Sequence, residues 1–409
     1  MNRFPSTLVG LSLIAGLLAG CAGEFVKPDL SIPLCSLETV AEFPGKQITG
    51  IAVTRQGRIF INSPRWHDDF DGISVASLNP DGTLSPFPDA AWNAWAPSAS
   101  ALASTPAATT SDEPAAPAAD PLNTWVCVQS VHVDLKNRLW VVDPASPKLA
   151  GVIPGGAKLV ELDPKSGKVN RIIRFDDTIA PTKSYLNDVR IDTETETAFL
   201  TDSGLGGIIV VNLANGTSRR LLDNDSSVLA EPGLIPVVGG IPLRFGGTPN
   251  GAPFVGHSDG IALDQVRGHL YWQSLTGKAL YRVRTKLLRE GKLSPEKLAA
   301  EVENLGPTVV TDGMEVDEKA NIYYTALEKN ALVLRIPDGR QILLAQDDRL
   351  AWPDSLSFGP SGTLYVTTAR IHQTAWFSAN GTQPDPLIQP FGIYRIKLPL
   401  AVRQLPQRP

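Results

Sequence analysis

The chain has 409 residues, with 37 Lys and Arg against 42 Asp and Glu and a formal net charge of -5. Hydrophobic residues make up 43% and charged residues 19%, while 35 Gly and 34 Pro indicate frequent turns. This composition excludes collagen, a coiled coil and wholesale disorder, and the mild acidity argues against a nucleic-acid partner. Three cysteines are too few for a disulfide scaffold.

Residues 1–20 are predicted to be a lipoprotein signal peptide. Arg3 gives a positive start, residues 8–18 are largely apolar, and the segment LAGC, which ends at Cys21, resembles the bacterial lipobox, in which the Cys thiol is lipidated. The apolar stretch is too short to span a bilayer. Ala22 follows the cysteine, and in the resembling Gram-negative lipoproteins a residue other than Asp implies the outer membrane. We therefore expect an exported protein, facing the periplasm or the exterior, that contacts the membrane only through lipid on Cys21.

The next segment, residues 21–36, is predicted to be a tether. Export places the protein in an oxidising compartment, and lipidation of Cys21 leaves Cys35 and Cys127. These two residues form either a disulfide or two unpaired thiols, since pairing geometry is not accessible from sequence.

A repeat organises residues 37–398. Six segments share a polar first residue, an alternating apolar strand, a tight turn and a second strand, which is the hairpin pattern. They are TGIAVTRQGRIFIN from Thr49, QSVHVDLKNRLWVV from Gln129, NDVRIDTETETAFLT from Asn187, DGIALDQVRGHLYWQ from Asp259, DGMEVDEKANIYYT from Asp312 and DSLSFGPSGTLYVT from Asp354. Further strands follow in several units, and the shortest spacing suits one propeller blade. The sequence therefore predicts an all-β protein, a six-bladed β-propeller.

The ends of the repeat region are expected to meet in one blade. The last unit ends with FGIYRI at residues 391–396, which is only a third strand, and LETVAEF at residues 37–43 can supply the outer one. Residues 399–409 then form a C-terminal tail.

Two long connections interrupt the repeat. Residues 96–120 contain 21 Ala, Pro, Ser or Thr among 25, which predicts a disordered loop because so little apolar surface can be buried. Residues 230–257 are rich in Gly and Pro but also apolar, and we expect them to form an ordered lid over the channel mouth.

The residues that open the six units are expected to converge on the central axis near one face. They are Thr49, Gln129, Asn187, Asp259, Asp312 and Asp354. All six offer oxygen, which suits one divalent cation such as Ca²⁺ or Mg²⁺, and clustered carboxylates repel one another without one. The alternative is a water-filled channel in which these side chains stay solvated or bond to nearby backbone.

Several motifs resemble the major royal jelly protein/yellow family. They are NSPRW at residues 62–66, LNPDGTLSPFPDAAWNAW at 78–95, RLWVVD at 138–143, LNDVRID…FLTDSGLGGIIVVNL at 186–213, HSDGIALD, LYWQSLTGKALYRV, TDGMEVDEKANIYYT and RLAWPDSLSFGPSGTLYVT. The resemblance covers roughly residues 37–398. It implies an exported six-bladed propeller whose channel binds small amines in some members, while insect yellow-type members are linked to dopachrome conversion.

A more distant similarity is to the gluconolactonase/regucalcin family, also six-bladed propellers. Its members hold a divalent cation with a Glu, two Asn-type residues and an Asp, and Asn187, Asp259 and Asp312 match three of these positions. Thr49 stands at the position of the Glu. The loss of this charged ligand argues against lactonase activity.

Loops on the same face carry further candidates for ligand binding or catalysis. Arg65 and Trp66 suit an anionic or aromatic ligand, although a rim salt bridge and a core Trp are equally consistent with them. His257 and His372 are candidate ligand or general-base residues, and Asp312 is a second candidate base. The Asp202-Ser203-Gly204 segment is predicted to make a turn.

Two function classes follow from these observations. The first is a monomeric, lipid-anchored binding protein that captures a small polar or aromatic molecule in its channel. The alternative is an enzyme, either a metal-dependent gluconolactonase-like hydrolase or a yellow-type isomerase, that uses Asp312 or His257 as the catalytic base. Fold alone does not decide between them.

Overall fold

The computed structural model describes residues 33–67, 70, 72–96, 120–381 and 389–404. The predicted signal peptide, the lipidation site Cys21 and nearly all of the insertion 96–120 lie outside the described residues. Within the described ranges, no helix is long and apolar enough to cross a membrane.

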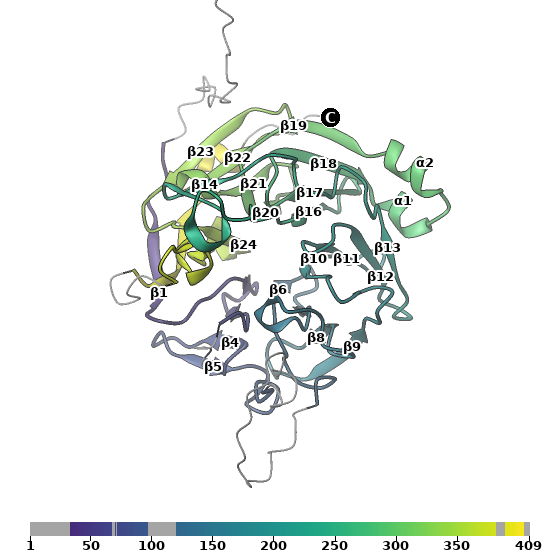
Figure 1. Cartoon of the computed structure of the whole chain (residues 1–409), viewed down its shortest axis with the longest axis horizontal. Helices are drawn as coiled ribbons and strands as arrows, with labels where there is room; N and C mark the ends of the chain where they lie inside the picture. The colour runs from purple at the N-terminus through teal and green to yellow at the C-terminus, as the bar shows by residue number, and fades with distance from the viewer. Residues whose placement is uncertain (1–32, 68–69, 71, 97–119, 382–388, 405–409) are drawn as a thin grey trace, which may run out of the picture.

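Six four-stranded antiparallel sheets surround a central axis as the blades of a β-propeller, which confirms the predicted fold (Figure 1). In the order inner to outer strand, blade 1 consists of β2 (Ile51–Val53), β3 (Ile59–Asn62), β4 (Val75–Leu78) and β5 (Leu84–Pro86). Blade 2 consists of β6 (Ser130–Val133), β7 (Leu139–Asp143), β8 (Lys158–Leu162) and β9 (Val169–Arg174). Blade 3 consists of β10 (Leu186–Asp192), β11 (Thr197–Asp202), β12 (Ile208–Asn212) and β13 (Ser218–Leu221).

The remaining blades repeat this order, and the last one joins the two ends of the propeller region. Blade 4 consists of β16 (Ser258–Asp264), β17 (His269–Ser274), β18 (Ala279–Arg284) and β19 (Glu303–Pro307). Blade 5 consists of β20 (Thr311–Val316), β21 (Ile322–Ala326), β22 (Ala331–Arg335) and β23 (Gln341–Gln346). Blade 6 consists of β24 (Pro353–Gly359), β25 (Thr363–Thr368), β26 (Phe391–Lys397) and β1 (Glu38–Phe43), so the N-terminal strand supplies the outer edge, as predicted.

Burial follows the position of each strand in its blade. The second strand of blade 3, β11, is buried along its whole length, because neighbouring blades cover both of its faces, whereas the outer strand β9 has one buried residue, Ile173. The cores therefore lie between blades: Trp140 and Leu159 of blade 2 pack with Leu186 and Leu200 of blade 3.

Short elements lie on connections between strands. The helices α1 (Thr285–Glu290) and α2 (Pro295–Ala300) precede β19 at the outer edge of blade 4 (Figure 1). Residues 230–257 form the β14–β15 hairpin (Val237–Val238 and Ile241–Pro242) and a helical turn at Phe245–Gly247. The predicted tail contains the helix α3 (Leu400–Arg403), whose Val402 packs into the core of blades 5 and 6.

Candidate functional site

Glycines bring the inner strands close together where they begin. A Cβ atom at Gly260 would lie 2.4 Å from the Asp312 carbonyl oxygen, and one at Gly313 would lie 2.2 Å from the Asp354 carbonyl oxygen. The Asp-Gly pairs of blades 4 and 5 therefore place each carboxyl beside the next strand, which no larger residue would permit.

Threonines near the end of the second strands hold the same backbone. Thr201 donates to the Asp259 carbonyl (2.6 Å), and the hydroxyl of Thr325 accepts from the backbone N–H groups of Asp312 (3.2 Å) and Gly313 (2.9 Å). Thr367 likewise donates to the Thr49 carbonyl. The start of each of these inner strands is thus fixed by its own blade or by the preceding one.

The carboxyls that the repeat placed on the axis are buried and close enough to affect one another. Burial, followed by repulsion from Asp312, raises the pKa of Asp259 well above its usual range, and the same two causes raise that of Asp354. Burial raises the pKa of Asp312 to about 7, while a hydrogen bond from Trp352 Nε1 (2.7 Å) to its Oδ2 partly opposes this increase. Burial and mutual repulsion therefore favour the protonated forms of these carboxyls.

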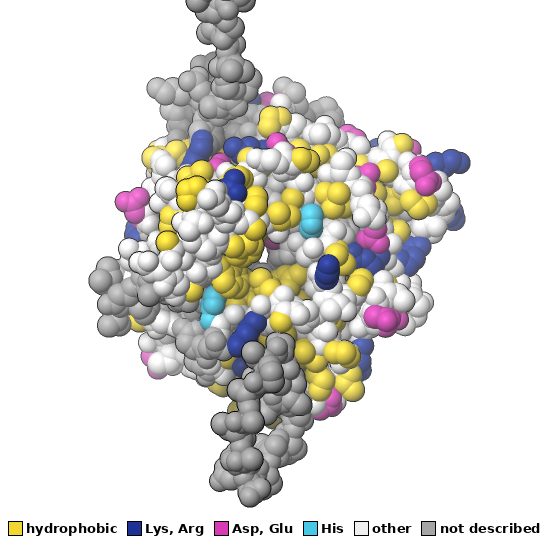
Figure 2. Space-filling model, viewed as in Figure 1, with side chains coloured by type: hydrophobic (Ala, Val, Ile, Leu, Met, Phe, Trp, Pro, Cys, Tyr) yellow, Lys and Arg dark blue, Asp and Glu magenta, His cyan; other side chains and the backbone are white. Residues whose placement is uncertain are grey.

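Three of the predicted ring residues share a cavity of about 480 Å³ on this face. Asn187 Nδ2 donates to Asp259 Oδ2 (2.8 Å), and Asp259 shares a hydrogen bond with Asp312. These three polar residues line the cavity together with Ser203 and several aromatic side chains. Apolar side chains gather around the central hollow on the face that carries the β14–β15 hairpin (Figure 2).

Aromatic side chains form a wall of this cavity. Trp66 Nε1 donates to the Tyr185 hydroxyl (2.7 Å), which in turn donates to Gln129 Oε1 (2.8 Å). Trp376 lies against Trp66, with ring centroids 5.6 Å apart, and Phe254 of the predicted lid also lines the cavity. The cavity therefore combines an acidic, hydrogen-bonded part with an aromatic surface.

The other three ring residues, Thr49, Gln129 and Asp354, do not line the cavity, and each is hydrogen-bonded within the protein. The hydroxyl of Thr49 donates to the Gln129 carbonyl (3.2 Å) and accepts from Asn62 Nδ2 (2.8 Å). The side-chain oxygen of Gln129 accepts from Tyr185. Asp354 accepts from the Ser355 hydroxyl (3.0 Å) and is not among the residues that line the cavity.

The basic candidates, Arg65, His257 and His372, make their contacts elsewhere in the described part of the chain. Arg65 donates to the carbonyls of Val126 and Trp95, so it braces a loop. His257 Nδ1 accepts from the backbone of Ala230 (3.0 Å), and burial lowers the pKa of this imidazole. His372 stacks on Trp352, lines a separate pocket beside Arg370, and has its pKa lowered to about 4 by burial.

The residues of the predicted metal set are hydrogen-bonded within the protein. Asn187 presents its amide N–H₂ group to Asp259, and Asp312 is hydrogen-bonded to Trp352. Among the described residues, no group of three or more His, Cys, Asp and Glu side chains is arranged to hold a metal ion. Cys35 and Cys127 are also unpaired, and Cys127 is buried in the core near Tyr185.

Two buried aspartates hold the loops that surround the cavity. Asp143 accepts from the backbone N–H groups of Val126, Cys127 and Ala145 and pairs with the fully buried Lys158 at 2.9 Å. Asp202 is equivalent in blade 3: it accepts from Tyr185 N–H and Gly204 N–H and pairs with Arg220 at 2.7 Å. The hydrogen bonds of Asp202 to Gly204 and Leu205 confirm the predicted turn. Because Asp143 and Asp202 both hold backbone N–H groups in place, their role is structural.

The family profile described as major royal jelly protein matches residues 126–375, which is more than half of the chain. The chain belongs to the major royal jelly protein family. No curated protein matches it. The family match includes Asn187, Asp259 and Asp312 but not Thr49.

Solved structures similar to this member of the family are also propellers. A gluconolactonase from Xanthomonas campestris is 13% identical, with a TM-score of 0.51 and coverage of 89% of this chain and 90% of that one. The calcium-binding protein regucalcin from Agrobacterium tumefaciens is 12% identical, with a TM-score of 0.51 and coverage of 90% and 96%. At this identity the likeness shows a shared fold.

Sequence reasoning missed several residues that line the cavity. Tyr185 lies two residues before the ring position Asn187, and this closeness in sequence indicated that its side chain could lie at the cavity. Trp376 follows the sixth unit in a loop without a repeat pattern, so its position depends on packing against Trp66. The sequence also did not indicate that Phe254, Val255 and Gly256, in the segment predicted to be a lid, line the cavity.

Proposed function

We propose that the cavity binds a small organic cation with an aromatic body, such as an arylalkylamine. The observation that carries this proposal is the pairing of buried carboxyls, Asp259 and Asp312, with the aromatic wall formed by Trp66 and Trp376. Buried carboxyls that repel one another are relieved by a cation, and tryptophan faces attract ammonium groups. A cavity of about 480 Å³ is large enough for such a molecule.

The cavity also argues against an anionic ligand. Its only basic side chain among the described lining residues is Lys183, whereas two carboxyls and Asn187 lie together. An ammonium group beside Asp312 would replace the proton that this carboxyl holds, and the ring of the ligand would pack against the aromatic wall.

Thermal unfolding with matched ligands tests the proposal. Tryptamine should raise the melting temperature, since a ligand at 100 times its Kd stabilises the folded state by about 2.7 kcal/mol. Tryptophol, which has the same ring system and a neutral hydroxyl, should give a much smaller shift. Stabilisation by Ca²⁺ or Mg²⁺ that EDTA reverses, with no response to tryptamine, would favour a divalent cation instead and would contradict the amine.

We also propose that the propeller is displayed on a membrane through lipid on Cys21. The support is the LAGC segment after a short apolar stretch, followed by residues 21–36 as a tether. Cells grown with labelled palmitate should yield a labelled protein, and Cys21→Ala should abolish the label and leave an unprocessed chain. A label that survives this substitution would contradict lipidation at this cysteine.

A second candidate function is proton-transfer catalysis, either isomerisation or lactone hydrolysis. It is favoured by the pKa of Asp312, which is about 7, and by the hydrogen bond between this carboxyl and Asp259. Two carboxyls with different proton affinities suit a general acid and base. Turnover of dopachrome or of a lactone that Asp312→Asn abolishes would establish it.

A further inference from the structure

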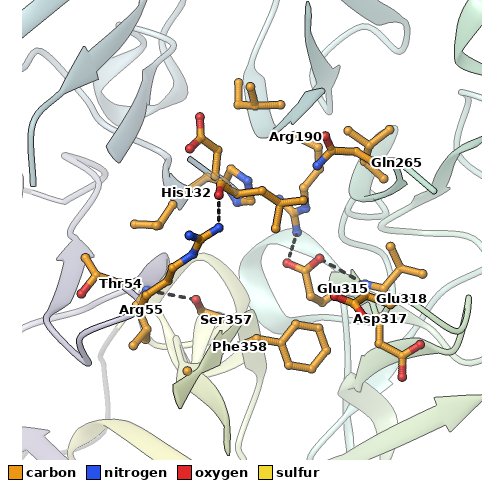
Figure 3. A pocket seen from close by; sticks show the side chains of 18 of the residues that line it. Thr54, Arg55, His132, Arg190, Gln265, Glu315, Asp317, Glu318, Ser357 and Phe358 are labelled. Atoms are coloured by element: carbon orange, nitrogen blue, oxygen red, sulfur yellow. Dashed lines mark hydrogen bonds and ion pairs between the residues drawn. The ribbon is translucent and has the colours of Figure 1, made fainter. Parts of the chain in front are cut away.

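A second cavity, of about 370 Å³, opens where the inner strands end, at the opposite end of the channel. His132 of β6 and Arg190 of β10 project into its middle, Glu315 of β20 faces Arg190, and Phe358 of β24 forms one side (Figure 3). None of these residues lines the cavity of about 480 Å³ around Asp259 and Asp312, which we call the amine cavity.

Arg190 is a buried cation whose Nε–H group is an unsatisfied hydrogen-bond donor within the described ranges. Only 7% of its surface is exposed, and its terminal nitrogens donate to the carbonyls of Val189 (2.9 Å) and Met314 (2.6 Å). Glu315 balances its charge at 3.6 Å. Among the described residues its Nε has no hydrogen-bond partner, which is a cost that an oxygen from a ligand would relieve.

His132 offers a donor and an acceptor beside this arginine. Burial, and then the neighbouring Arg190, lower the pKa of His132 well below its usual value, so the imidazole is neutral and has one N–H and one bare nitrogen. Neither ring nitrogen has a hydrogen-bond partner within the described part of the chain. The recess therefore presents polar groups of both kinds.

The charge of the lining disfavours an anion. Arg55 and Arg190 face five carboxylates, and only two of these, Asp134 and Asp264, are paired with arginines outside the cavity. The innermost charged group, the guanidinium of Arg190, in turn disfavours a cation. A neutral molecule with several hydroxyls satisfies donors and acceptors together.

The rim of the cavity is apolar. Leu135 is 60% exposed and Val266 is 72% exposed, at the turns of blades 2 and 4, and both line the opening together with Phe358 and Pro360. Such side chains at a polar recess suit a ligand that has an apolar face as well as hydroxyl groups.

We propose that this end of the channel is a binding site for a neutral polyhydroxylated ring, of the size of a mono- or disaccharide. Hydroxyls of the sugar bond to Arg190, His132 and Glu315, while its C–H face packs on Phe358 and the rim. The site is separate from the amine cavity and does not depend on the function proposed for that cavity.

Ligand-observed saturation-transfer NMR with D-glucose and maltose tests this site. At least one sugar should show transfer, with a Kd of about 1 mM, and His132→Ala and Phe358→Ala should each weaken its binding about tenfold or more, a loss of about 1.4 kcal/mol. His269→Ala, which removes a histidine on β17 outside both cavities, is the matched control and should leave the Kd unchanged. Circular dichroism verifies that each variant is folded, and Phe358→Ala serves if His132→Ala fails to fold.

Three outcomes would overturn the proposal. The first is that neither sugar shows saturation transfer at about 100 times the expected Kd. The second is binding that both His132→Ala and Phe358→Ala leave unchanged, which would place the sugar elsewhere. The third is competition by sodium acetate at constant ionic strength, which would identify an anion site.

Discussion

Replacing Lys158 by alanine is expected to destabilise the protein by about 3–5 kcal/mol, because it leaves the buried carboxylate of Asp143 without its cation. The ammonium group of Lys158 also donates to the carbonyls of Pro121 (3.0 Å) and Gly156 (2.9 Å), which would lose a buried donor. Chemical denaturation measures this loss as a lower midpoint with an unchanged slope.

A matched surface lysine provides the control. Lys136 pairs with Glu196 at 2.6 Å, but its side chain is 51% exposed, so Lys136→Ala should cost less than about 1 kcal/mol. Equal effects of the two substitutions would contradict a structural role for the Asp143–Lys158 pair. Asp143 anchors the loop that leads to Ser146 and Leu149, which line the amine cavity. Lys158→Ala should therefore also weaken ligand binding there.

Asp312→Asn is expected to reduce the affinity for tryptamine about 30-fold or more, which corresponds to about 2 kcal/mol or more. Asparagine keeps the shape of the side chain, and its Oδ1 can still accept from Trp352 Nε1, but it carries no charge. The fold should survive, because the substitution also removes repulsion among buried carboxyls. Isothermal titration calorimetry measures the change in Kd.

Glu315→Gln is the matched control for this substitution. Glu315 is also a carboxyl on β20, with a side chain only 14% exposed, but it lies at the other end of the channel, beside Arg190. Its amide variant should leave tryptamine affinity within about twofold of the wild type. An equal loss in both variants would mean that general charge, and not contact with the cavity, governs binding.

The architecture was predictable from the sequence because the repeat is local. Each unit carries its own hairpin pattern, and Asp-Gly at residues 259–260 and 312–313 indicated where the inner strands begin. The missing fourth strand of the last blade had one candidate, residues 37–43, which pairs with β26.

The site was less predictable, because equivalent backbone positions do not have equivalent side-chain partners. Repeat alignment made all six ring residues alike, yet Thr49 bonds to the Gln129 carbonyl and only Asn187, Asp259 and Asp312 line the cavity. The stacking of His372 on Trp352 depends on a contact with the loop after the sixth unit, which has no repeat pattern. At the other end of the channel, Arg190 stands between the apolar residues Val189 and Ile191 of β10, and this charge within a predicted inner strand was a signal that the repeat alone did not reveal.

The central claim, that a cation displaces the proton of Asp312 in the cavity, is tested most directly by counting protons released on binding. Because the folded-state pKa of Asp312 is raised to about 7, this carboxyl holds a proton at about pH 6, and an ammonium group beside it favours the ionised form. Calorimetry of tryptamine binding in buffers of different ionisation enthalpy should therefore show net proton release at about pH 6, release that fades above about pH 8, and affinity that rises between these values. Asp312→Asn should release fewer protons. Binding with no proton release and an affinity independent of pH would contradict the account.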